Sequence, residues 1–388
     1  MIAKKSKIII LLVVFFLSLV GLYCNFYFAY TPTYSNNQMH SNAYNNSPSY
    51  SCKNNSVDYS SASPKIAWIQ STTSAAFPAR MRHTSLVYNN RMWVIGGEGE
   101  HGELLNDVWY SSDGAIWIEA NGSAEFSGRY DPLSLVYNNR MWVIGGWGVP
   151  ANSSSGKGMM LNDVWYSSDG NQWNEATAST TFPPRTGATA ITYANKMWII
   201  GGENASGIPL NDVWYSSDGV QWYEANASAA FPPRDRATSV AYANKMWIID
   251  GENDVGIPLN DVWYSSDGVQ WYEANVSATF PSRMEATSVV YNDRIWIIGG
   301  SNGQQSTFTT VPYFNDVWSS LDGSIWTPDT CENISDGSLY SSFQPRESHT
   351  SVVYNDRIWI IAGALNMPNN PPFDVQFMND TWYSDESP

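Results

Sequence analysis

The chain has 388 residues and a formal net charge of −16, with charged residues making up only 14% of it. Its acidity argues against nucleic-acid binding, which usually requires a basic surface. Nineteen tryptophans and 23 tyrosines provide far more core-forming surface than a disordered chain carries.

Residues 1–30 predict an N-terminal membrane anchor or signal segment. Lysines at positions 4, 5 and 7 precede an uncharged, mostly apolar run at residues 8–30. A helix of that length spans the roughly 30 Å hydrocarbon core of a bilayer, with the lysines on the cytoplasmic side. We therefore expect a single-pass protein of the cell membrane, with the rest of the chain outside the cytoplasm. A cleaved signal peptide is the alternative, and it would make the protein secreted.

Residues 31–63 are rich in Asn, Ser and Tyr and show no sustained hydrophobic period, which is typical of a flexible linker. The remaining residues, 64–388, form the folded part. Three cysteines cannot build a disulfide framework. We expect at most one bridge, between Cys52 and Cys331, which an extracytoplasmic location would permit.

From Phe77 onward one unit recurs six times, about every 50 residues, and its most regular part is the motif Asn-Asp-Val/Thr-Trp. Each copy contains four short segments rich in Val, Ile, Trp and Tyr, separated by turn sequences. In the copy that begins at Phe231, we predict strands at Thr238–Tyr242, Lys245–Ile249, Asp261–Tyr264 and Trp271–Ala274. Four short strands repeated at this period predict an all-β, six-bladed β-propeller with four-stranded antiparallel blades.

The tryptophans predict how the ring closes. Eighteen of the nineteen fall on three positions per unit, but the sixth unit ends before its fourth-strand tryptophan. Trp68, in the segment Ala67-Trp68-Ile69-Gln70, supplies the missing residue, one period before Trp117. We therefore expect residues 65–70 to pair with the C-terminal strand and complete the last blade.

The order of motifs within each unit resembles the kelch repeat: Pro-Pro-Arg, an apolar strand, a tight turn, Trp-Ile-Ile-Gly-Gly, Asn-Asp-Val-Trp and a final Trp. The resemblance covers residues 65–384 and implies a propeller whose inter-blade connections and strand-two-to-three loops line one binding face. Many kelch propellers are binding modules; a minority, such as galactose oxidase and sialic-acid mutarotases, are enzymes. This chain departs from galactose oxidase, since it lacks the expected copper ligands. We expect no metal and no cofactor, and structural roles for His83 and His349.

An arginine recurs once per unit, and we expect it to brace the junctions between blades. The six are Arg80, Arg129, Arg185, Arg234, Arg283 and Arg346. A carboxylate-binding triad drawn from these six is the alternative, because guanidinium groups suit that role.

Candidate ligand-binding residues lie where the repeat breaks. The strand-two-to-three loops of the second, fifth and sixth units are long and carry aromatic residues that suit sugar stacking or partner anchoring, among them Trp147, Phe308, Tyr313 and Phe373. Packing within their own loops is the alternative role. Arg82 and Arg236 follow the repeated arginine, and we expect them near the mouth of the central channel. Acidic residues occupy the corresponding stretches: Asp131, Asp235, Glu285 and Glu347.

Asn-x-Ser/Thr sites in the predicted exported part fit a glycoprotein. The candidates are Asn121, Asn152, Asn204, Asn226, Asn275 and Asn333. Because Asn121, Asn226 and Asn275 are copies of one repeat position, they do not count as independent evidence.

No catalytic set can be assigned from the residues. We therefore expect an extracytoplasmic cell-surface binding or adhesion propeller that presents one loop face to a glycan or protein ligand. The alternatives are a carbohydrate-active enzyme of the sialidase or sialic-acid mutarotase type, and a structural envelope component.

Overall fold

The computed structural model describes residues 66–150, 156–303, 313–329, 331–332, 339–340, 343–367 and 374–385. Their regular elements are all strands. Within these ranges there is no helical segment with the length and hydropathy needed to cross a bilayer. The predicted anchor (1–30) and linker (31–63), Cys52, Phe308, Phe373 and Asn152 and Asn333 lie outside the described residues.

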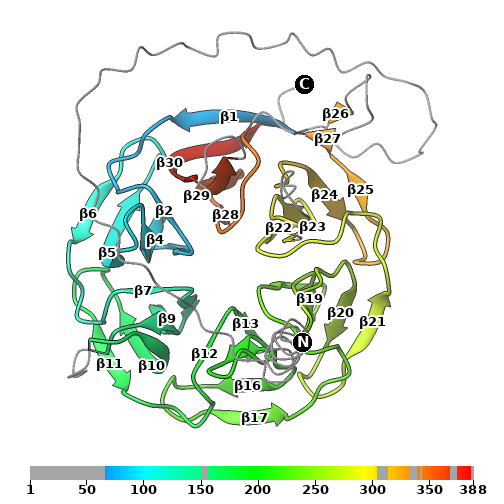
Figure 1. The fold of residues 1–388 in the computed structure, drawn as a ribbon, viewed down its shortest axis with the longest axis horizontal. Coiled ribbons are helices and arrows are strands. Elements are labelled where there is room, and N and C mark those ends of the chain that lie inside the picture. The colour runs from blue at the N-terminus through cyan, green and yellow to red at the C-terminus, as the bar shows by residue number, and fades with distance from the viewer. Residues whose placement is uncertain are drawn as a thin grey trace, which may run out of the picture. The chain divides into compact units, whose positions relative to one another are not determined.

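The strands form a ring of antiparallel sheets, the blades of an all-β propeller (Figure 1), as the repeats predict. Three blades are separate four-stranded sheets, a short extra strand extends the second blade to five strands, and another joins the first and last blades into one nine-stranded sheet. Blade 1 contains β3 (Thr84–Tyr88), β4 (Arg91–Gly99), β5 (Leu104–Ser111) and β6 (Ile118–Asn121). Blade 2 contains β8 (Leu133–Tyr137), β9 (Arg140–Gly148), β10 (Met159–Ser167) and β11 (Asn174–Thr177). Blade 3 contains β13 (Thr189–Tyr193), β14 (Lys196–Ile200), β16 (Val213–Ser216) and β17 (Tyr223–Asn226).

The second half of the ring follows the same order. Blade 4 contains β18 (Thr238–Tyr242), β19 (Lys245–Ile249), β20 (Val262–Ser265) and β21 (Tyr272–Asn275). Blade 5 contains β22 (Thr287–Tyr291), β23 (Arg294–Ile298), β24 (Val317–Ser320) and β25 (Thr327–Pro328). Blade 6 contains β28 (Thr350–Val353), β29 (Ile358–Met367), β30 (Asp374–Asp385) and β1 (Ala67–Thr72). The short strands outside the blades are β2 (Arg80–Met81), β7 (Arg129–Tyr130), β12 (Arg185–Thr186), β15 (Glu203–Asn204), β26 (Cys331–Glu332) and β27 (Leu339–Tyr340).

The strand boundaries in blade 4 match the sequence prediction closely. The first two strands, β18 and β19, have the predicted limits, whereas β20 and β21 each begin and end one residue later than predicted. Ala243 and Asn244 join β18 to β19, with φ of 49° and 57°. Positive φ at both central residues is the geometry of a type I′ turn, whose twist matches that of the flanking strands.

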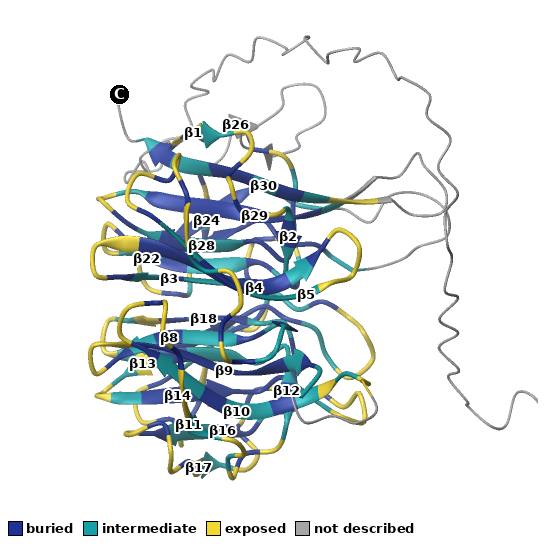
Figure 2. Cartoon of the chain, turned by 90° about the vertical axis from the view of Figure 1, so that its left-hand side faces the viewer, coloured by how far each residue is buried: buried dark blue, intermediate teal, exposed yellow. Residues whose placement is uncertain are grey.

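The hydrophobic core lies between neighbouring blades, and the buried residues concentrate in the sheets while the turns are exposed (Figure 2). One cluster joins Trp93 and Ile95 of blade 1 to Met141 and Val143 of blade 2. The Trp93 ring lies so close to the Ser-Ser-Asp-Gly turn of blade 2 that a Cβ on Gly170 would approach Trp93 Cζ3 to 2.0 Å. The turn glycine is thus required both by its φ of +78° and by the tryptophan beside it.

The predicted closure of the ring is confirmed. β1 pairs antiparallel with β30, and Trp68 lies opposite Ser384. Trp68 is 5% exposed and makes an edge-to-face contact with Phe343, with ring centroids 5.3 Å apart. Phe77 and Trp117 make the equivalent contact in blade 1. The N-terminal strand therefore restores in blade 6 the packing that the other blades obtain from their own fourth strand.

The repeated arginines brace the blade junctions, as predicted. The backbone N–H of Arg234 donates to Leu210 O of blade 3 (3.0 Å), while its guanidinium donates to both carboxylate oxygens of Asp261 in blade 4 (2.8 and 2.7 Å). All six are at most 2% exposed, and all six make the same two-pronged contact with the aspartate of their own blade. The pairs are Arg80–Asp107, Arg129–Asp163, Arg185–Asp212, Arg234–Asp261, Arg283–Asp316 and Arg346–Asp380.

Candidate functional site at the channel mouth

Six equivalent residues surround one end of the central channel, each two positions after the repeated arginine. In blade order they are Arg82, Asp131, Gly187, Arg236, Glu285 and Ser348. All six have φ between 50° and 61°, a left-handed conformation that is uncommon for residues other than glycine. The backbone at this position is therefore repeated, but the side chains are not. We call these residues the mouth ring.

Hydrogen bonds between blades hold the mouth ring in place. The N–H of Arg82 donates to Ser348 O, and the N–H of Asp131 donates to Arg82 O, at 3.0 and 2.9 Å. On the other side, the N–H groups of Arg236 and Glu285 donate to Gly187 O and Arg236 O, at 2.7 and 3.1 Å. The side chains thus project from a framework that other parts of the fold determine, which favours precise positioning.

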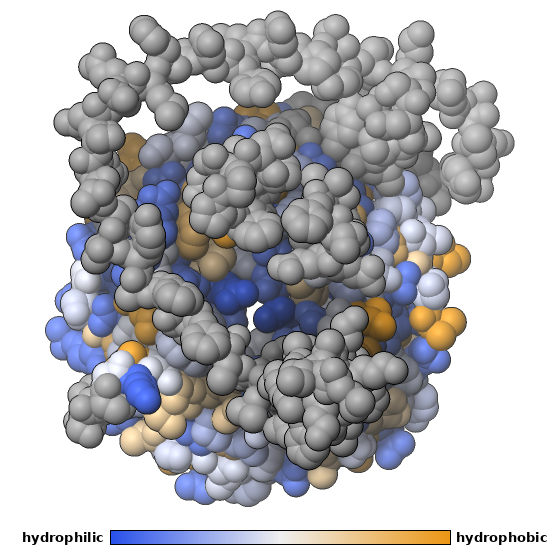
Figure 3. All heavy atoms as spheres, viewed as in Figure 1, coloured by the Kyte–Doolittle hydropathy of each residue, from blue (hydrophilic) through white to orange (hydrophobic). Residues whose placement is uncertain are grey.

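The mouth ring lies on the same face as the loops between the second and third strands. The residue just before each ring position pairs with the start of that loop, as Met81 does with Glu98 and Asp235 with Glu252. The face that the kelch resemblance implies for binding therefore carries both the ring and the starts of these loops. In the space-filling view, hydrophilic residues surround the hollow at the centre of the ring (Figure 3).

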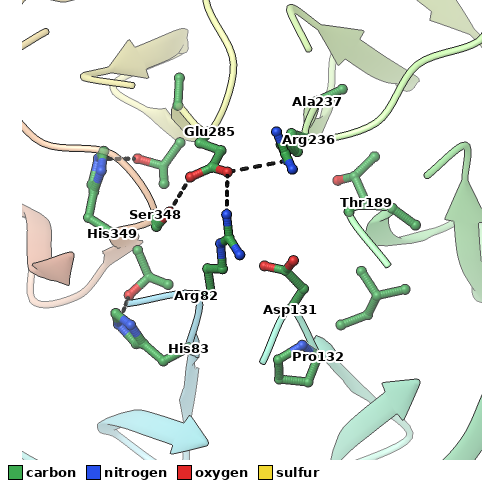
Figure 4. A pocket seen from close by; sticks show the side chains of 16 residues that line it. Arg82, His83, Asp131, Pro132, Thr189, Arg236, Ala237, Glu285, Ser348 and His349 are labelled. Carbon is green, nitrogen blue, oxygen red and sulfur yellow. Dashed lines mark hydrogen bonds and ion pairs between the residues drawn. The ribbon is translucent and has the colours of Figure 1, made fainter. Parts of the chain in front are cut away.

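A cavity of about 230 Å³ lies at this mouth. Two arginines from blades 1 and 4 converge there on the carboxylate of Glu285 from blade 5 (Figure 4). Arg82 Nη2 lies 3.4 Å and Arg236 Nε 3.3 Å from Glu285 Oε1, and the Ser348 hydroxyl donates to Oε2. The two arginine side chains are 25% and 32% exposed, and Glu285 is 9% exposed. Arg236 Nη1 also pairs with Glu252 Oε2, at 3.1 Å. The cavity thus contains two guanidinium groups that are ion-paired and still partly exposed.

The carboxylates near the mouth have different pKa values. Burial raises the pKa of Glu285, but Arg82 and Arg236 outweigh it, so the pKa lies below its usual value. Burial raises the pKa of Asp131, although Arg82 opposes the shift. Burial, partly opposed by Arg236, raises the pKa of Asp235 to about 7. Glu285 is therefore the ionised partner of the two arginines near neutral pH.

Glu347, just before Ser348, is the second carboxyl group with a strongly raised pKa. Burial, assisted by the negative charge of Glu285, raises its pKa to about 7. The hydroxyl groups of Ser301 and Tyr313 donate to its two oxygens. Hydroxyl donors tolerate a protonated carboxyl group as well as an ionised one, so this side chain can gain or lose a proton near neutral pH without losing its contacts.

Hydroxyl pairs join the innermost strands around the channel. At two junctions a histidine is the threonine's partner instead, and the serines at the usual position, Ser85 and Ser351, have buried hydroxyl groups without a hydrogen-bond partner. Thr238 bonds to Ser288 across blades 4 and 5 at 2.6 Å. In blades 1 and 6 the threonine partner is instead a histidine Nε2, with Thr350–His83 at 2.8 Å and Thr287–His349 at 3.1 Å. Burial lowers the pKa of His83 well below its ordinary value and that of His349 to about 3, so both are neutral. These contacts support the structural role that we predicted.

Where the described residues are concerned, no cluster of three His, Cys, Asp or Glu side chains could hold a metal ion. The structure instead brings together two of the predicted binding residues, Arg82 and Arg236, through Glu285. Sequence reasoning placed Glu285 and Asp131 near the mouth but did not identify Ser348. The sequence does contain a signal for Ser348: it stands two residues after a repeated arginine, and the same offset identifies all six mouth-ring residues.

Trp147 lies in β9 and is partly buried, outside the set of cavity-lining residues. Its ring stacks on Tyr130 at a centroid distance of 5.1 Å and an angle of 15°. Gly158 lies so close to the six-membered part of the Trp147 ring that a Cβ at this position would clash with it. Arg82 extends the stack, since its guanidinium carbon lies 5.4 Å from the centre of the Tyr130 ring. Trp147 is thus connected to the cavity through two side chains, and its role in ligand binding stays a prediction.

Tyr313 approaches the mouth through Glu347, toward which its hydroxyl donates at 3.4 Å. Cys331 lies in β26, and its predicted partner Cys52 lies outside the described residues, so the bridge stays a prediction.

Comparison with known proteins supports the assignment of the repeat. The family model described as the KLHDC2/KLHL20/DRC7 Kelch-repeats domain matches residues 43–228 and 153–363, together most of the chain. A solved structure titled "Structure of YjhT" is similar with a TM-score of 0.61 and 15% sequence identity, over 81% of this chain and 96% of that one. Identity this low shows a common fold and no more. No curated protein matches the chain. The chain therefore belongs to the Kelch-repeat family.

Proposed function

We propose that this chain is a membrane-anchored, extracytoplasmic binding protein, a six-bladed propeller whose channel mouth holds an acidic group of a glycan or protein ligand. The observation that carries the proposal is the convergence of Arg82 and Arg236 on one carboxylate, that of Glu285. The location rests on the apolar N-terminal run that follows three lysines.

The Glu285 carboxylate indicates which kind of ligand group the site can bind. It is planar and anionic, and it receives hydrogen bonds from two guanidinium groups and the Ser348 hydroxyl. Charge-assisted bonds of this kind are roughly twice as strong as neutral ones. A ligand carboxylate, sulfate or phosphate that enters the cavity would compete with Glu285 for these partly exposed guanidinium groups.

The cavity is small for a site that encloses a whole ligand. Its volume of about 230 Å³ falls below the roughly 300–1,000 Å³ of typical small-molecule sites. It suits one terminal group of a larger molecule, the rest of which would lie across the loop face. We expect Trp147, whose ring stacks on Tyr130 beside Arg82, to contact that remainder.

Glycan and peptide arrays probed with the detergent-solubilised full-length protein test this proposal. We expect binding to acidic probes that is lost in Arg236→Gln and Arg82→Gln and weakened in Trp147→Ala. Partly exposed Arg294→Gln, at the start of the second strand of blade 5 and away from the mouth, is the matched control. Equal binding by the wild type and both mouth-ring variants would refute the site, and protease accessibility of the propeller on intact cells tests its location.

A carbohydrate-active enzyme of the sialidase or sialic-acid mutarotase type is the second candidate. Asp235 and Glu347 directly precede the cavity-lining residues Arg236 and Ser348, and burial raises the pKa of each carboxyl group to about 7, which suits proton transfer. Against it, the six repeated arginines are fully engaged with aspartates and so do not supply a carboxylate-binding triad. Turnover of sialosides, or accelerated exchange between sugar anomers followed by NMR, would favour the enzyme. Binding without turnover favours the first candidate, and neither result supports a structural envelope component.

A further inference from the structure

The described residues contain five Asn-x-Ser/Thr sequences whose local structures differ. These are at Asn121, Asn204, Asn226, Asn275 and Asn379. An N-linked glycan attaches to the side-chain amide nitrogen. The surroundings of that nitrogen therefore decide which of these asparagines can carry a glycan in the folded protein.

At the three copies of the repeat position, the nitrogen connects neighbouring blades. Asn226 Nδ2 donates to Val269 O of blade 4 at 2.7 Å, and Asn275 Nδ2 donates to Ser324 O of blade 5 at 2.7 Å. Asn121 Nδ2 makes the same contact with blade 2, at 2.6 Å. Each side-chain oxygen accepts the N–H of the serine two residues later, at 2.9 Å. A sugar on this nitrogen would have to occupy the space of the next blade's turn.

Asn379 is engaged in ring closure. Its nitrogen donates to Ala75 O and Phe77 O, at 3.1 and 3.2 Å, and so holds the N-terminal segment against β30. These contacts leave its nitrogen directed into the protein.

Asn204 has the opposite orientation. It ends β15 and begins an exposed turn, in which Gly207 N–H donates to Asn204 O at 2.9 Å. Its side-chain oxygen faces the turn and accepts the N–H groups of Ser206 and Ile208, at 2.9 and 3.2 Å. Since the oxygen takes the inner position, the nitrogen lies on the outer side, and residues 205–208 beside it are exposed.

We propose that Asn204 is the N-glycosylation site of the described propeller, and that Asn121, Asn226, Asn275 and Asn379 are structural asparagines. The reaction joins Asn204 Nδ2 to the anomeric carbon of a lipid-pyrophosphate-linked oligosaccharide. The amide loses one proton and the lipid pyrophosphate leaves. Because Asn204 pairs with Arg185 in β12, which leads to Gly187 of the mouth ring, the glycan stands on the binding face.

The chain contains its own control. In blade 4, Asn253 begins the same turn: its oxygen accepts the N–H groups of Val255 and Ile257, at 3.1 and 3.0 Å. Gly256 N–H donates to Asn253 O at 3.1 Å, as Gly207 does to Asn204. The two turns differ at two residues: Asp254 stands where Ala205 stands in blade 3, and Val255 stands where Ser206 stands. Of these, only Val255 occupies the acceptor position that requires Ser or Thr. The variant V255S therefore completes the acceptor sequence without changing the turn.

The test is site occupancy in the full-length protein produced in cultured animal cells. Enzymatic deglycosylation in ¹⁸O water followed by peptide mass spectrometry marks each occupied asparagine. We expect a label at Asn204 and none at the four structural asparagines, loss of the Asn204 label in S206A, and a new label at Asn253 in V255S. An unlabelled Asn204 overturns the proposal, as does labelling of Asn226 or Asn275 at a comparable level.

Discussion

Arg234 and Arg236 are two residues apart in one connection, yet they belong to different parts of the molecule. Arg234 is fully buried, and its guanidinium satisfies Asp261, Asp250 O and Pro232 O. Arg236 is 32% exposed, lies in a left-handed conformation and shares Glu285 with Arg82. The first contact is repeated in every blade, whereas the mouth-ring position holds five different residue types.

The difference separates what the ring needs in order to fold from what one face needs in order to bind. A contact that holds a junction is the same at each junction, because each presents the same geometry. The mouth-ring position is different, because its residues vary and its backbone conformation favours glycine. A non-glycine residue there has a cost in conformational free energy that the needs of the fold do not explain. Such positions are where we expect ligand contacts.

The largest effect should come from breaking a brace. Arg234→Ala leaves the Asp261 carboxylate buried without its partner, a change that typically costs about 3–5 kcal/mol. Urea unfolding of the wild type and variant measures the loss. The exposed Glu175→Ala is a control that should stay near the wild type. A loss below about 1 kcal/mol would mean that the braces do not stabilise the junctions.

Asp250→Gly should have the opposite sign. Asp250 occupies the position of the first glycine in the Gly-Gly pairs of blades 1, 2, 3 and 5 and has a φ of 57°. Its Oδ1 accepts the N–H of Thr238 at 3.2 Å, but its Oδ2 is buried without a hydrogen-bond partner. Relief of such a conformation is worth of order 1–3 kcal/mol. We therefore expect the free energy of unfolding to increase. An unchanged or lower value would mean that the hydrogen bond from Thr238 outweighs the relief of the backbone conformation.

The gain at Asp250 should also grow with pH. Burial raises its pKa well above the ordinary value, so the folded protein keeps a proton that the unfolded chain releases. Stability from this group is complete below the ordinary pKa, near 4, and declines as pH rises toward the folded value. The difference between Asp250→Gly and the wild type should thus be larger at pH 7 than at pH 4.

A smaller pH effect should come from Glu347. Its pKa of about 7 means that the wild type loses stability between about pH 4.5 and 7, for the same reason. Glu347→Gln keeps the shape of the side chain and removes the titration. Tm values from pH 4.5 to 8 should vary less in this variant, whereas the exposed Glu273→Gln should follow the wild type. Equal pH profiles for Glu347→Gln and the wild type would contradict the assignment.

The repeated part of the molecule could be predicted from the sequence, because repetition compares six copies of each contact within one chain. The tryptophan register predicted the pairing of β1 with β30, and the once-per-unit arginine predicted the braces. The asymmetric contacts could not be predicted this way. The meeting of Arg82, Arg236 and Glu285 depends on how far side chains from blades 1, 4 and 5 reach across the channel.

Trp147 also shows how far the sequence can predict an asymmetric contact. It was the one tryptophan outside the repeat pattern, which marked it as a candidate for ligand contact. Its stacking on Tyr130 depends on the pairing of β7 with β9, where Tyr130 lies opposite Trp147. A departure from the repeat therefore identifies an unusual residue, but only the register shows which neighbour it contacts.

The smallest effect on stability, and the sharpest test of the comparison, should come from Arg236→Gly. Blade 3 already has Gly187 at this position, so the backbone accepts the change. Relief of positive φ favours the variant, while loss of partly exposed ion pairs, each worth about 0–1 kcal/mol, opposes it. We expect the free energy of unfolding, measured with urea, to change by no more than about 1 kcal/mol, and binding to acidic probes on the array to be lost. Large destabilisation would instead show that Arg236 stabilises the ring as Arg234 does, because the two arginines would then differ in exposure but share a structural role.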